Sequence, residues 1–319
     1  MQITYVAKHR QECSNDDEGS IAYALQQLGH SVFCMNEGEA HHLHKSKYRD
    51  LLLFHKWEAS NLANPNVRDR FGKIAFWYFD LVLCDDPTLR KRCDTRVGWM
   101  HRVLPWVDLG FCTDGDWVAT AGTHPAIGEH SAKLRWLCQG ADERVIGQGE
   151  ARCRCCNQAY EGPPILLTGI SKGGGKLRES FISELQERWG SQFLHIERGV
   201  HGRDMAHLIA QSKIVVCPDY PVTDRYWSNR VWNALGFGAF VLHPYCRGLE
   251  EMIGVDSADR APLLTYQSRQ HLHELIRDYL QLPTSRSLTA LAGLEAVKAA
   301  HTYQHRCQQL MQVIQEHKR

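Results

Sequence analysis

The first half of the chain alternates between short apolar runs and amphipathic stretches. Residues 3–7 form an apolar run that predicts a strand, and residues 19–28 carry apolar side chains at helical spacing. Further strands are predicted at residues 31–35, 51–54, 74–78, 109–112 and 134–137. Two aspartates followed by Pro87 predict the start of a helix that continues to about Val103. This order of elements indicates a parallel sheet with helices on its faces.

The pattern breaks between residues 147 and 164, where glycines and prolines surround a cysteine cluster. A second series of strands and helices follows this break. Its strands are predicted at residues 165–168, 193–196, 214–217, 240–243 and 263–266, and its helices at residues 175–189, 203–212, 228–235, 269–282, 285–300 and 303–318. We therefore expect two α/β domains, residues 1–150 and residues 151–319, each built on a parallel sheet.

The composition is that of an ordinary globular protein. Hydrophobic residues make up 43% of the 319 positions and charged residues 23%, which excludes a disordered, collagenous or coiled-coil chain. The formal net charge of +1 provides no overall basic footprint for nucleic acid, although a local one is compatible with it. No apolar run reaches the ~18 residues of a membrane helix, and the first lysine comes too early for a signal peptide. We expect a cytoplasmic protein without a membrane span, as a monomer or weak dimer.

The 12 cysteines are spread along the chain, which favours free thiols in a reducing compartment over a disulfide framework. Cys153 and Cys156 have the C-x-x-C spacing of half a tetrahedral zinc site. A full site needs two more ligands, and the sequence has no second C-x-x-C pair. Solvated linker thiols are the alternative interpretation of this cluster, and no metal is expected.

A glycine-rich segment follows the strand predicted at residues 165–168. Gly169 and Ser171 lie in it, and Lys172, Lys176 and Arg178 add positive charge. Glycines let the backbone approach a ligand closely, and the free N–H groups at a helix start attract anions. The spacing matches neither the P-loop nor the dinucleotide fingerprint, which argues against a kinase or a dehydrogenase. The alternative is a flexible turn with solvated lysines.

A second anion site is predicted at the start of the helix at residues 228–235. Ser228 is a good N-cap, and Asn229 and Arg230 follow it in the first turn. A hydroxyl, an amide, a guanidinium and the helix dipole would together form a diphosphate cradle that needs no metal. The alternative is an ordinary capped helix in which Arg230 pairs with a local carboxylate.

This stretch resembles a known family. Ser-Asn-Arg-Val-x-Asn-Ala-Leu-Gly-x-Gly-Ala-Phe-Val-Leu-His-Pro at residues 228–244, followed by Gly-Leu-Glu-Glu at residues 248–251, is similar to the donor-site helix of two-domain glycosyltransferases. The nearest group is the spore-maturation-type and group-1-like transferases of bacteria and phages. Residues 137–142 and the tail at residues 266–314 are also similar to this group, so that the resemblance covers roughly residues 134–319.

The resemblance implies the GT-B architecture, in which two Rossmann-like domains face each other across a cleft. It also implies that the last helix, at about residues 303–318, returns to the N-terminal domain. The implied reaction moves a sugar from a nucleoside-diphosphate donor, here expected to be a UDP-sugar, to an acceptor hydroxyl. The N-terminal domain would bind the acceptor and the C-terminal domain the donor. The donor half has no Asp-x-Asp motif, so no obligatory metal or other cofactor is expected.

The resemblance also assigns site residues. The donor-binding candidates are Gly169, Ser171, Lys172, Lys176, Arg178, His201, Tyr226, Ser228, Asn229, Arg230 and Glu250. This chain departs from many relatives at Asn233, where they carry a glutamate. Either Glu250 or Glu251 would then contact the donor ribose, or the ribose is recognised differently. The departure leaves a second hypothesis open, a catalytically inactive nucleotide-binding module on the same scaffold.

An inverting reaction needs a base for the acceptor hydroxyl, and the candidates are carboxylates of the N-terminal half. Asp80 is favoured because the resemblance places a Trp-x-x-Asp at the end of this strand, and Asp17 is the second candidate. Neighbouring acidic residues also qualify, namely Asp16, Glu18, Asp114 and Asp116. The alternative for each of them is a helix or turn cap.

The acceptor class is the least determined part of the hypothesis. Glycans, proteins and small molecules are the default for the family, and phage relatives include transferases that modify hydroxylated DNA bases. Arg92, Arg96 and Arg102 lie in one basic helix of the N-terminal half, and Asp114 is a further acceptor-side candidate. Five tryptophans of the same half would hold an extruded base if exposed, namely Trp57, Trp77, Trp99, Trp106 and Trp117. The alternative is a solvated basic helix over a tryptophan-rich core.

Overall fold

The computed structural model divides the chain into two compact units. The first unit comprises Met1–Gln139 and Tyr303–Arg319, and the second comprises Gly140–Thr302. The structure describes residues 1–9, 16–55, 62–82, 87–147, 162–169, 175–200, 202–218, 221–254 and 261–317. The chain therefore enters the second unit once, leaves it once, and ends in the unit where it began.

The first unit contains a six-stranded parallel sheet in the order β2-β1-β3-β4-β5-β6. Its strands are β1 (Gln2–Ala7), β2 (Ser31–Asn36), β3 (Arg49–Phe54), β4 (Phe71–Tyr78), β5 (Leu109–Cys112) and β6 (Leu134–Trp136). In the centre of the sheet Val6 pairs with Met35 on one side and with Phe54 on the other. The central strands are apolar on both faces, as expected for a parallel sheet that is covered on both sides.

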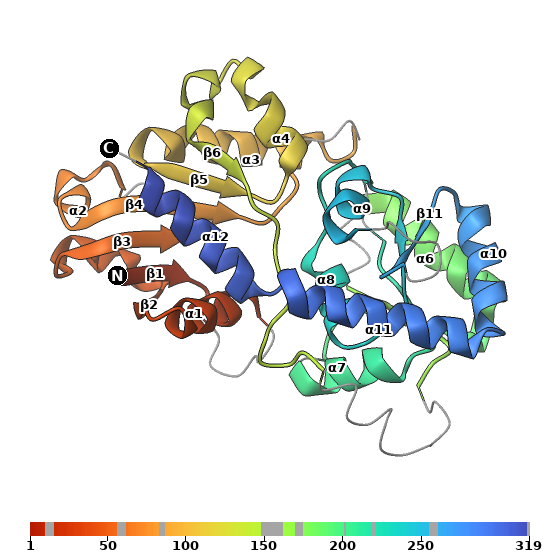
Figure 1. Ribbon diagram of the computed structural model, residues 1–319. Helices are drawn as coiled ribbons and strands as arrows, with labels where there is room; N and C mark the ends of the chain where they lie inside the picture. Colours follow the sequence, from red (N-terminus) through yellow and green to blue (C-terminus); the bar gives the residue numbers. More distant parts are fainter. Residues whose placement is uncertain are drawn as a thin grey trace. The chain divides into compact units, whose positions relative to one another are not determined.

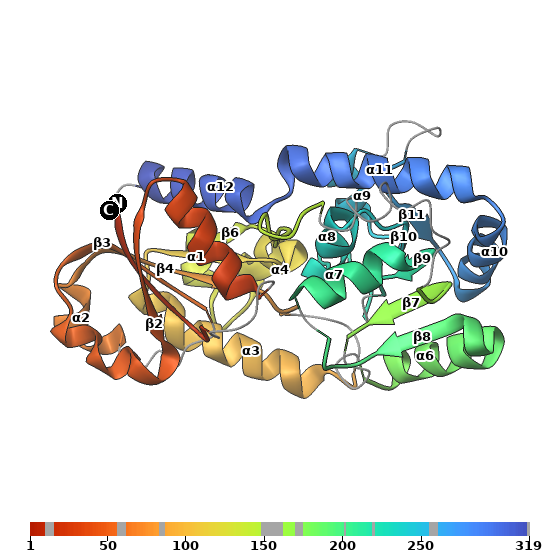
Figure 2. The same ribbon diagram turned by 90° about the horizontal axis from the view of Figure 1, so that it is seen from below.

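Helices cover both faces of this sheet (Figures 1 and 2). They are α1 (Asp17–Gln27), α2 (Pro65–Arg68), α3 (Arg90–Val103), α4 (Gly115–Thr120) and α12 (Tyr303–Glu316), with short 3₁₀ helices at Glu37–Lys45, Leu104–Trp106, Ala121–Thr123 and Gly128–Lys133. Buried side chains of α1 and α12 form one apolar cluster with the sheet, and those of α3 and α4 form the other. Figure 2 shows α1 and α12 on one side of the sheet and α3 on the opposite side.

The last helix belongs to the first unit because its apolar stripe faces that sheet. Tyr303, Cys307, Leu310, Met311 and Ile314 recur at helical spacing and are all buried. They pack with the sheet and α1 in a single cluster. The expectation that the last helix returns to the N-terminal domain is confirmed.

The second unit contains a five-stranded parallel sheet in the order β11-β10-β9-β7-β8. Its strands are β7 (Ile165–Thr168), β8 (Phe193–Ile196), β9 (Ile214–Val216), β10 (Val241–Pro244) and β11 (Leu264–Tyr266). Its helices are α6 (Gly175–Trp189), α7 (Gly202–Gln211), α8 (Asn229–Gly236), α9 (Arg247–Ile253), α10 (Arg269–Leu280) and α11 (Pro283–Ala300), with a 3₁₀ turn at Gly190–Gln192. Buried residues of α6 and α10 cover one face of the sheet, and α8 packs beside α7 and α11 (Figure 1).

Both sheets begin with the strand order 2-1-3-4-5. In such a sheet the connections from the first and third strands leave in opposite directions, so a crevice opens between the carboxyl ends of these two strands. Ligands of open α/β proteins bind at this switch point. The switch points lie between β1 and β3 in the first unit, and between β7 and β9 in the second.

The structure agrees with most of the predicted elements. The strand at residues 165–168 and the helix at residues 175–189 have the predicted bounds, and two α/β units with parallel sheets are confirmed. The sequence analysis missed the 3₁₀ helix Glu37–Lys45 and the short helices α2, α4 and α9. Each is too short for its apolar spacing to stand out from that of a loop.

Candidate active site

The switch point of the second sheet contains Gly169, directly after β7. Its φ angle of +106° lies in the left-handed region that favours glycine. Its N–H donates to the carbonyl of Ile196 at 2.9 Å, and its own carbonyl accepts a hydrogen bond from Nε2 of His195 at 2.8 Å. Strand β8 thus holds both polar groups of the turn that follows β7.

Two guanidinium groups converge on this turn. A Cβ atom at Gly169 would lie 3.2 Å from Nη2 of Arg178 and 3.1 Å from Nη1 of Arg230. The side chain of Arg178 donates to the carbonyls of Pro218 at 2.8 Å and Thr168 at 3.1 Å, which connects the end of β7 to the segment after β9. Two permanent positive charges therefore lie at the switch point, where they favour an anionic ligand.

The helix that carries Arg230 is held by its buried face. Ser228 is the N-cap residue in extended conformation, and Asn229 and Arg230 form the first turn of α8. The buried residues of this helix are Val231, Trp232, Ala234, Leu235 and Gly236. The first backbone N–H groups of a helix have no acceptor within it and carry the positive end of its dipole. The start of α8 therefore adds to the charge at the same switch point.

The remaining donor candidates lie around α9 and α6. Gly248 is in close contact with Arg225, since a Cβ there would come within 2.7 Å of its Cγ. Tyr226 follows Arg225 and is half-buried. Glu250 accepts a hydrogen bond from the Thr265 hydroxyl at 2.6 Å, so its carboxylate is tied to β11. Lys176 is exposed in the first turn of α6. Their roles in donor binding stay predictions.

Five of the predicted donor-site and zinc positions lie outside the described residues. They are Ser171 and Lys172 of the glycine-rich segment, His201, and the zinc candidates Cys153 and Cys156.

In the first unit, the favoured base Asp80 comes just after β4 and pairs with Arg96 of α3. The distance from Nη2 of Arg96 to Oδ2 of Asp80 is 3.5 Å, and Arg96 also donates to the carbonyl of Leu81. Burial, and next the charge of Asp80, raise the pKa of the nearby Tyr78 well above its ordinary value. The structure thus places a predicted base, Asp80, next to a predicted acceptor-side cation, Arg96. The two side chains form an ion pair with each other.

The second base candidate, Asp17, connects distant parts of the first unit. Its Oδ1 accepts a hydrogen bond from the Tyr303 hydroxyl at 2.5 Å, and its Oδ2 accepts one from Nε2 of Gln139 at 2.9 Å. Arg306 in turn donates to the carbonyl of Gln139 at 3.2 Å. Both oxygens of Asp17 are therefore used to fix α1 to α12 and to the segment after β6.

The other acceptor-side candidates are separated from one another. Asp114 is only 1% exposed, because it caps α4 through Trp117 N–H and also accepts from Val82 N–H at 2.8 Å. Arg92 and Arg102 are exposed on α3, where Arg102 donates to the carbonyl of Gly98. The helix-cap interpretation therefore describes Asp114.

The switch point of the first sheet holds two histidines that the sequence analysis missed. His55 directly follows β3, and its backbone N–H donates to the carbonyl of Val6 at 3.3 Å. His9 comes shortly after β1, and its ring packs edge-on against that of Tyr5 at 5.1 Å. Their position just beyond the predicted apolar strands is the signal that could have identified them.

Comparison with known proteins shows what the second unit and the fold are similar to. Residues 164–312, a little less than half of the chain, match the family described as glycosyl transferase-like. This range lies almost entirely in the second unit, which is therefore similar to that family. A comparison with the curated proteins finds no match.

Solved structures share the fold over nearly the whole chain. Sucrose-phosphate synthase from Thermosynechococcus elongatus is 13% identical with a TM-score of 0.66, covering 99% of this chain and 98% of that one. An α,α-trehalose 6-phosphate synthase from Burkholderia multivorans is 10% identical with a TM-score of 0.62, covering 98% and 96%. Anabaena HepE in complex with UDP-glucose is 12% identical with a TM-score of 0.54, covering 99% of both chains. At these identities the likeness establishes the GT-B fold.

The structure decides between the two interpretations for three of the tryptophans. Trp77, Trp99 and Trp117 are at most 8% exposed and belong to the core of the first unit, whereas Trp106 is 44% exposed. Trp57 lies outside the described residues. The tryptophan-rich core is therefore the correct interpretation for these three residues. Trp77 packs in the cluster formed by the sheet, α1 and α12, whereas Trp99 and Trp117 pack in the cluster on the opposite face. This removes most of the aromatic support for a DNA-base acceptor.

Two general features complete the description of the structure. Among the described residues, no group of histidine, cysteine, aspartate or glutamate side chains has the arrangement of a metal site. Among the described helices, none combines the length and the hydrophobicity of a membrane span.

Proposed function

We propose that this protein transfers a sugar from a UDP-sugar to an acceptor hydroxyl, with the second unit holding the donor. The observation that carries the proposal is the convergence of Gly169, Arg178 and Arg230 at the switch point between β7 and β9. A nucleoside diphosphate needs close backbone approach and positive charge, and both are present there. The complex of HepE with UDP-glucose, on the same fold, supports UDP as the nucleotide.

The same residues suit the chemistry of the transfer. When the bond between the anomeric carbon and the diphosphate breaks, negative charge develops on the leaving phosphate oxygen. Donors that are already in place stabilise this charge without reorganisation. Arg178 is fixed by two backbone carbonyls, and Arg230 is held by the buried face of α8. The positive charge is thus preorganised.

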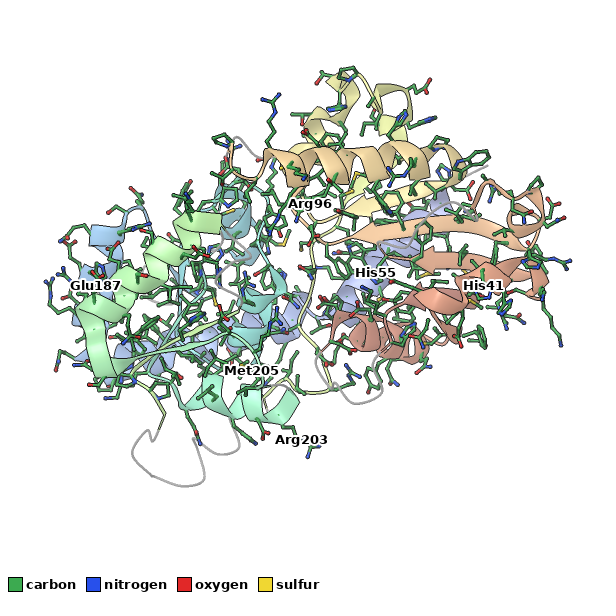
Figure 3. All side chains as sticks on the ribbon, turned by 180° about the vertical axis from the view of Figure 1, so that it is seen from behind. His41, His55, Arg96, Glu187, Arg203 and Met205 are labelled. Atoms are coloured by element: carbon green, nitrogen blue, oxygen red, sulfur yellow. The ribbon has the colours of Figure 1, made fainter. Side chains whose placement is uncertain are left out.

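Isothermal titration calorimetry with UDP tests the donor site. Arg230→Ala should weaken UDP binding by about 10- to 100-fold, because a hydrogen bond to a charged group contributes ~1.5–3 kcal/mol. Arg203→Ala is the matched control, since Arg203 is exposed on α7 (Figure 3) and should leave UDP affinity unchanged. Equal affinities in Arg230→Ala and the wild type would remove the donor assignment.

An inactive nucleotide-binding module is the second candidate, and Asn233 favours it. This amide stands where many relatives carry a carboxylate, and its Oδ1 is buried with no hydrogen bond from the described residues. Release of glucose or UDP from UDP-glucose separates the two candidates. An active transferase hydrolyses the donor slowly without an acceptor, whereas a binding module leaves it intact.

The acceptor class is part of the proposal and is tested by a panel. Glycans, proteins, small molecules and hydroxymethylated DNA are incubated with a UDP-sugar, and mass spectrometry detects the added sugar. Trp77, Trp99 and Trp117 are buried, so their rings are not available to stack on an extruded DNA base. We therefore expect transfer to an acceptor that is not a nucleic acid. If DNA is modified, its binding should weaken steeply with salt and respond to Arg92→Glu.

A further inference from the structure

The outermost strand of the first sheet, β2, has one open side. It lies at the end of the strand order and pairs with β1 alone among the described strands (Figure 1). Ser31 donates its N–H to the carbonyl of Met1 at 3.0 Å, so its backbone groups face β1. Because this direction alternates along a strand, the N–H and C=O groups of Val32 and Cys34 face away from β1. We call these groups the outward row.

The outward row ends at Asn36. The N–H of Asn36 faces the same way as the row, and it donates to Oε2 of Glu39 at 3.1 Å. This carboxylate takes the place that a further strand would have at this end of β2. Within the part of the chain that the structure describes, no hydrogen bond reaches the outward N–H and C=O groups of Val32 and Cys34. A short row of donors and acceptors is therefore open.

The side chains beside the row leave it accessible. Phe33 is 49% exposed and Cys34 is also exposed, and successive side chains of a strand point to opposite faces of the sheet. Neither face of the edge is therefore fully covered at this point. The sequence of β2, Ser-Val-Phe-Cys-Met-Asn, contains no charged residue and no proline, which natural proteins use to protect an open edge. The edge is suited to pairing with another strand.

The outward row is electrostatically complementary to a second copy of itself. In an antiparallel pair, two residues that face each other through their backbone groups exchange both hydrogen bonds. When two β2 strands run antiparallel with Phe33 opposite its equivalent, Val32 of each copy faces Cys34 of the other. Each N–H, which carries a partial positive charge, then meets a C=O with a partial negative charge. Every group of the row is paired in this register, and Asn36 keeps its bond to Glu39.

The same register brings the exposed aromatic rings together. Phe33 then occupies a position without direct backbone hydrogen bonds, where side chains of the two strands come closest. The two rings lie on the same face of the joined sheet and pack across the two-fold axis, and such aromatic pairs stabilise sheets. Within each copy, Cζ of Arg49 lies 5.4 Å from the centroid of the Phe33 ring, which helps to fix the ring.

We propose that β2 is a dimerisation strand, through which two copies of this protein join their first sheets into one continuous sheet. This contact is isologous and therefore closes at two copies. Pairing of β2 with the opposite edge of the sheet is less favourable, because β6 has only three residues and a head-to-tail contact would build an open filament. The contact is limited to one strand and its neighbours, so we expect a micromolar dissociation constant.

Sedimentation velocity of the full chain tests the proposal. The wild type should change from monomer to dimer over about 1–200 µM. Phe33→Lys should stay monomeric over this range, because like charges directly opposite each other repel. Trp106→Lys is the matched control, since Trp106 is 44% exposed in the same unit outside β2, and it should dimerise like the wild type. A monomeric wild type, or a Phe33→Lys variant that dimerises equally well, would overturn the proposal.

Disulfide trapping tests the register and does not depend on the lysine variant. In a Cys34→Ser background, Phe33→Cys places two thiols opposite each other with Cα atoms about 4.5 Å apart, within the range that a disulfide spans. Oxidation with diamide should link these copies about tenfold faster than Trp106→Cys in the same background. Thermal melting should show that each variant is folded. Equal rates of linkage would mean that any dimer uses another surface, and the assignment of β2 would be wrong.

Discussion

Gly169 shows how a single position combines backbone conformation with ligand chemistry. Its positive φ excludes most side chains, and the space where a Cβ would lie is bordered by the guanidinium groups of Arg178 and Arg230. Glycine is therefore required for two reasons. The left-handed backbone of the turn disfavours other residues, and a Cβ atom would be in tight contact with both guanidinium groups. A change at this residue should affect both stability and anion binding.

Replacing Gly169 with alanine separates these two effects. The left-handed backbone should cost roughly 1–2 kcal/mol of stability, and the new methyl group should displace the Arg230 guanidinium and weaken UDP binding by about tenfold or more. Gly190→Ala is the matched control, because Gly190 has φ of +51° and no neighbouring atom would lie within 4 Å of a Cβ added there. It should lose similar stability and keep its UDP affinity, as measured by urea unfolding and calorimetry.

The sequence predicted the local structure around the donor-site candidates better than that around the acceptor-side candidates. A glycine after a strand and an arginine in the first turn of a helix carry their own local signals, as at Gly169 and Arg230. The use of Asp17 depends on Tyr303, which is 286 positions away in the sequence. No local pattern contains such a contact, so the assignment of Asp17 as a base candidate could not anticipate its place in the fold.

At the scale of elements, α6 and α10 are connected by a partly buried polar network. Oε1 of Glu184 lies 2.9 Å from Nε2 of His273, and its Oε2 lies 2.6 Å from Nη1 of Arg269. Nδ1 of His273 accepts from the indole N–H of Trp189 at 3.0 Å. Burial raises the pKa of Glu184, but the hydrogen bonds from His273 and Arg269 outweigh it, so that the pKa is below its ordinary value of 4.5.

This network predicts a pH-dependent contribution to stability. A carboxylate with a lowered pKa in the folded state stabilises the fold above its unfolded-state pKa, and this contribution is lost as the pH falls through the folded-state value. Glu184→Gln should therefore lower the free energy of unfolding at pH 7, and the difference from the wild type should shrink below about pH 4. Glu187→Gln, exposed on the same helix (Figure 3), should show no such difference in urea unfolding at either pH.

The contact between α1 and α12 supports a second prediction at this scale. Burial, and next Asp17, raise the pKa of Tyr303 well above its ordinary value, so its hydroxyl stays protonated and donates to Asp17. Tyr303→Phe should lower the free energy of unfolding by about 1.5–3 kcal/mol, because a half-buried carboxylate loses a donor. Tyr48→Phe is the control, since Tyr48 is 60% exposed in the same unit. Unchanged stability in Tyr303→Phe would mean that water replaces the hydroxyl.

The elements themselves were predictable where apolar spacing was long enough. The helix at residues 175–189 has a full set of periodic positions, and its bounds match those of α6. The helix α9 has only seven residues, and close contact with Arg225 across Gly248 fixes its start. Such a helix is determined by tertiary packing, which a local pattern does not contain.

At the scale of the whole molecule, the two units differ in continuity. The second unit is one uninterrupted segment, Gly140–Thr302, whereas the first is completed by Tyr303–Arg319. Residues 140–302 expressed alone should therefore fold and bind UDP with nearly the affinity of the full chain. Residues 1–139 alone should aggregate, because the face covered by α12 is exposed, and fusion of residues 303–319 through a linker should restore folding. Circular dichroism and calorimetry measure both outcomes.

The return of α12 to the first unit also determines the order of events during synthesis. Domains of a growing chain usually fold from the N-terminus onward while translation proceeds. Here the strands of the first sheet are synthesised early, but the first unit lacks its final helix until synthesis ends. The second unit therefore completes its fold before the first. Until the ribosome releases the last residues, one apolar face of the nascent protein has no cover. Slow termination or a truncated transcript should therefore send this protein to chaperones and proteases, even though its second unit is already complete.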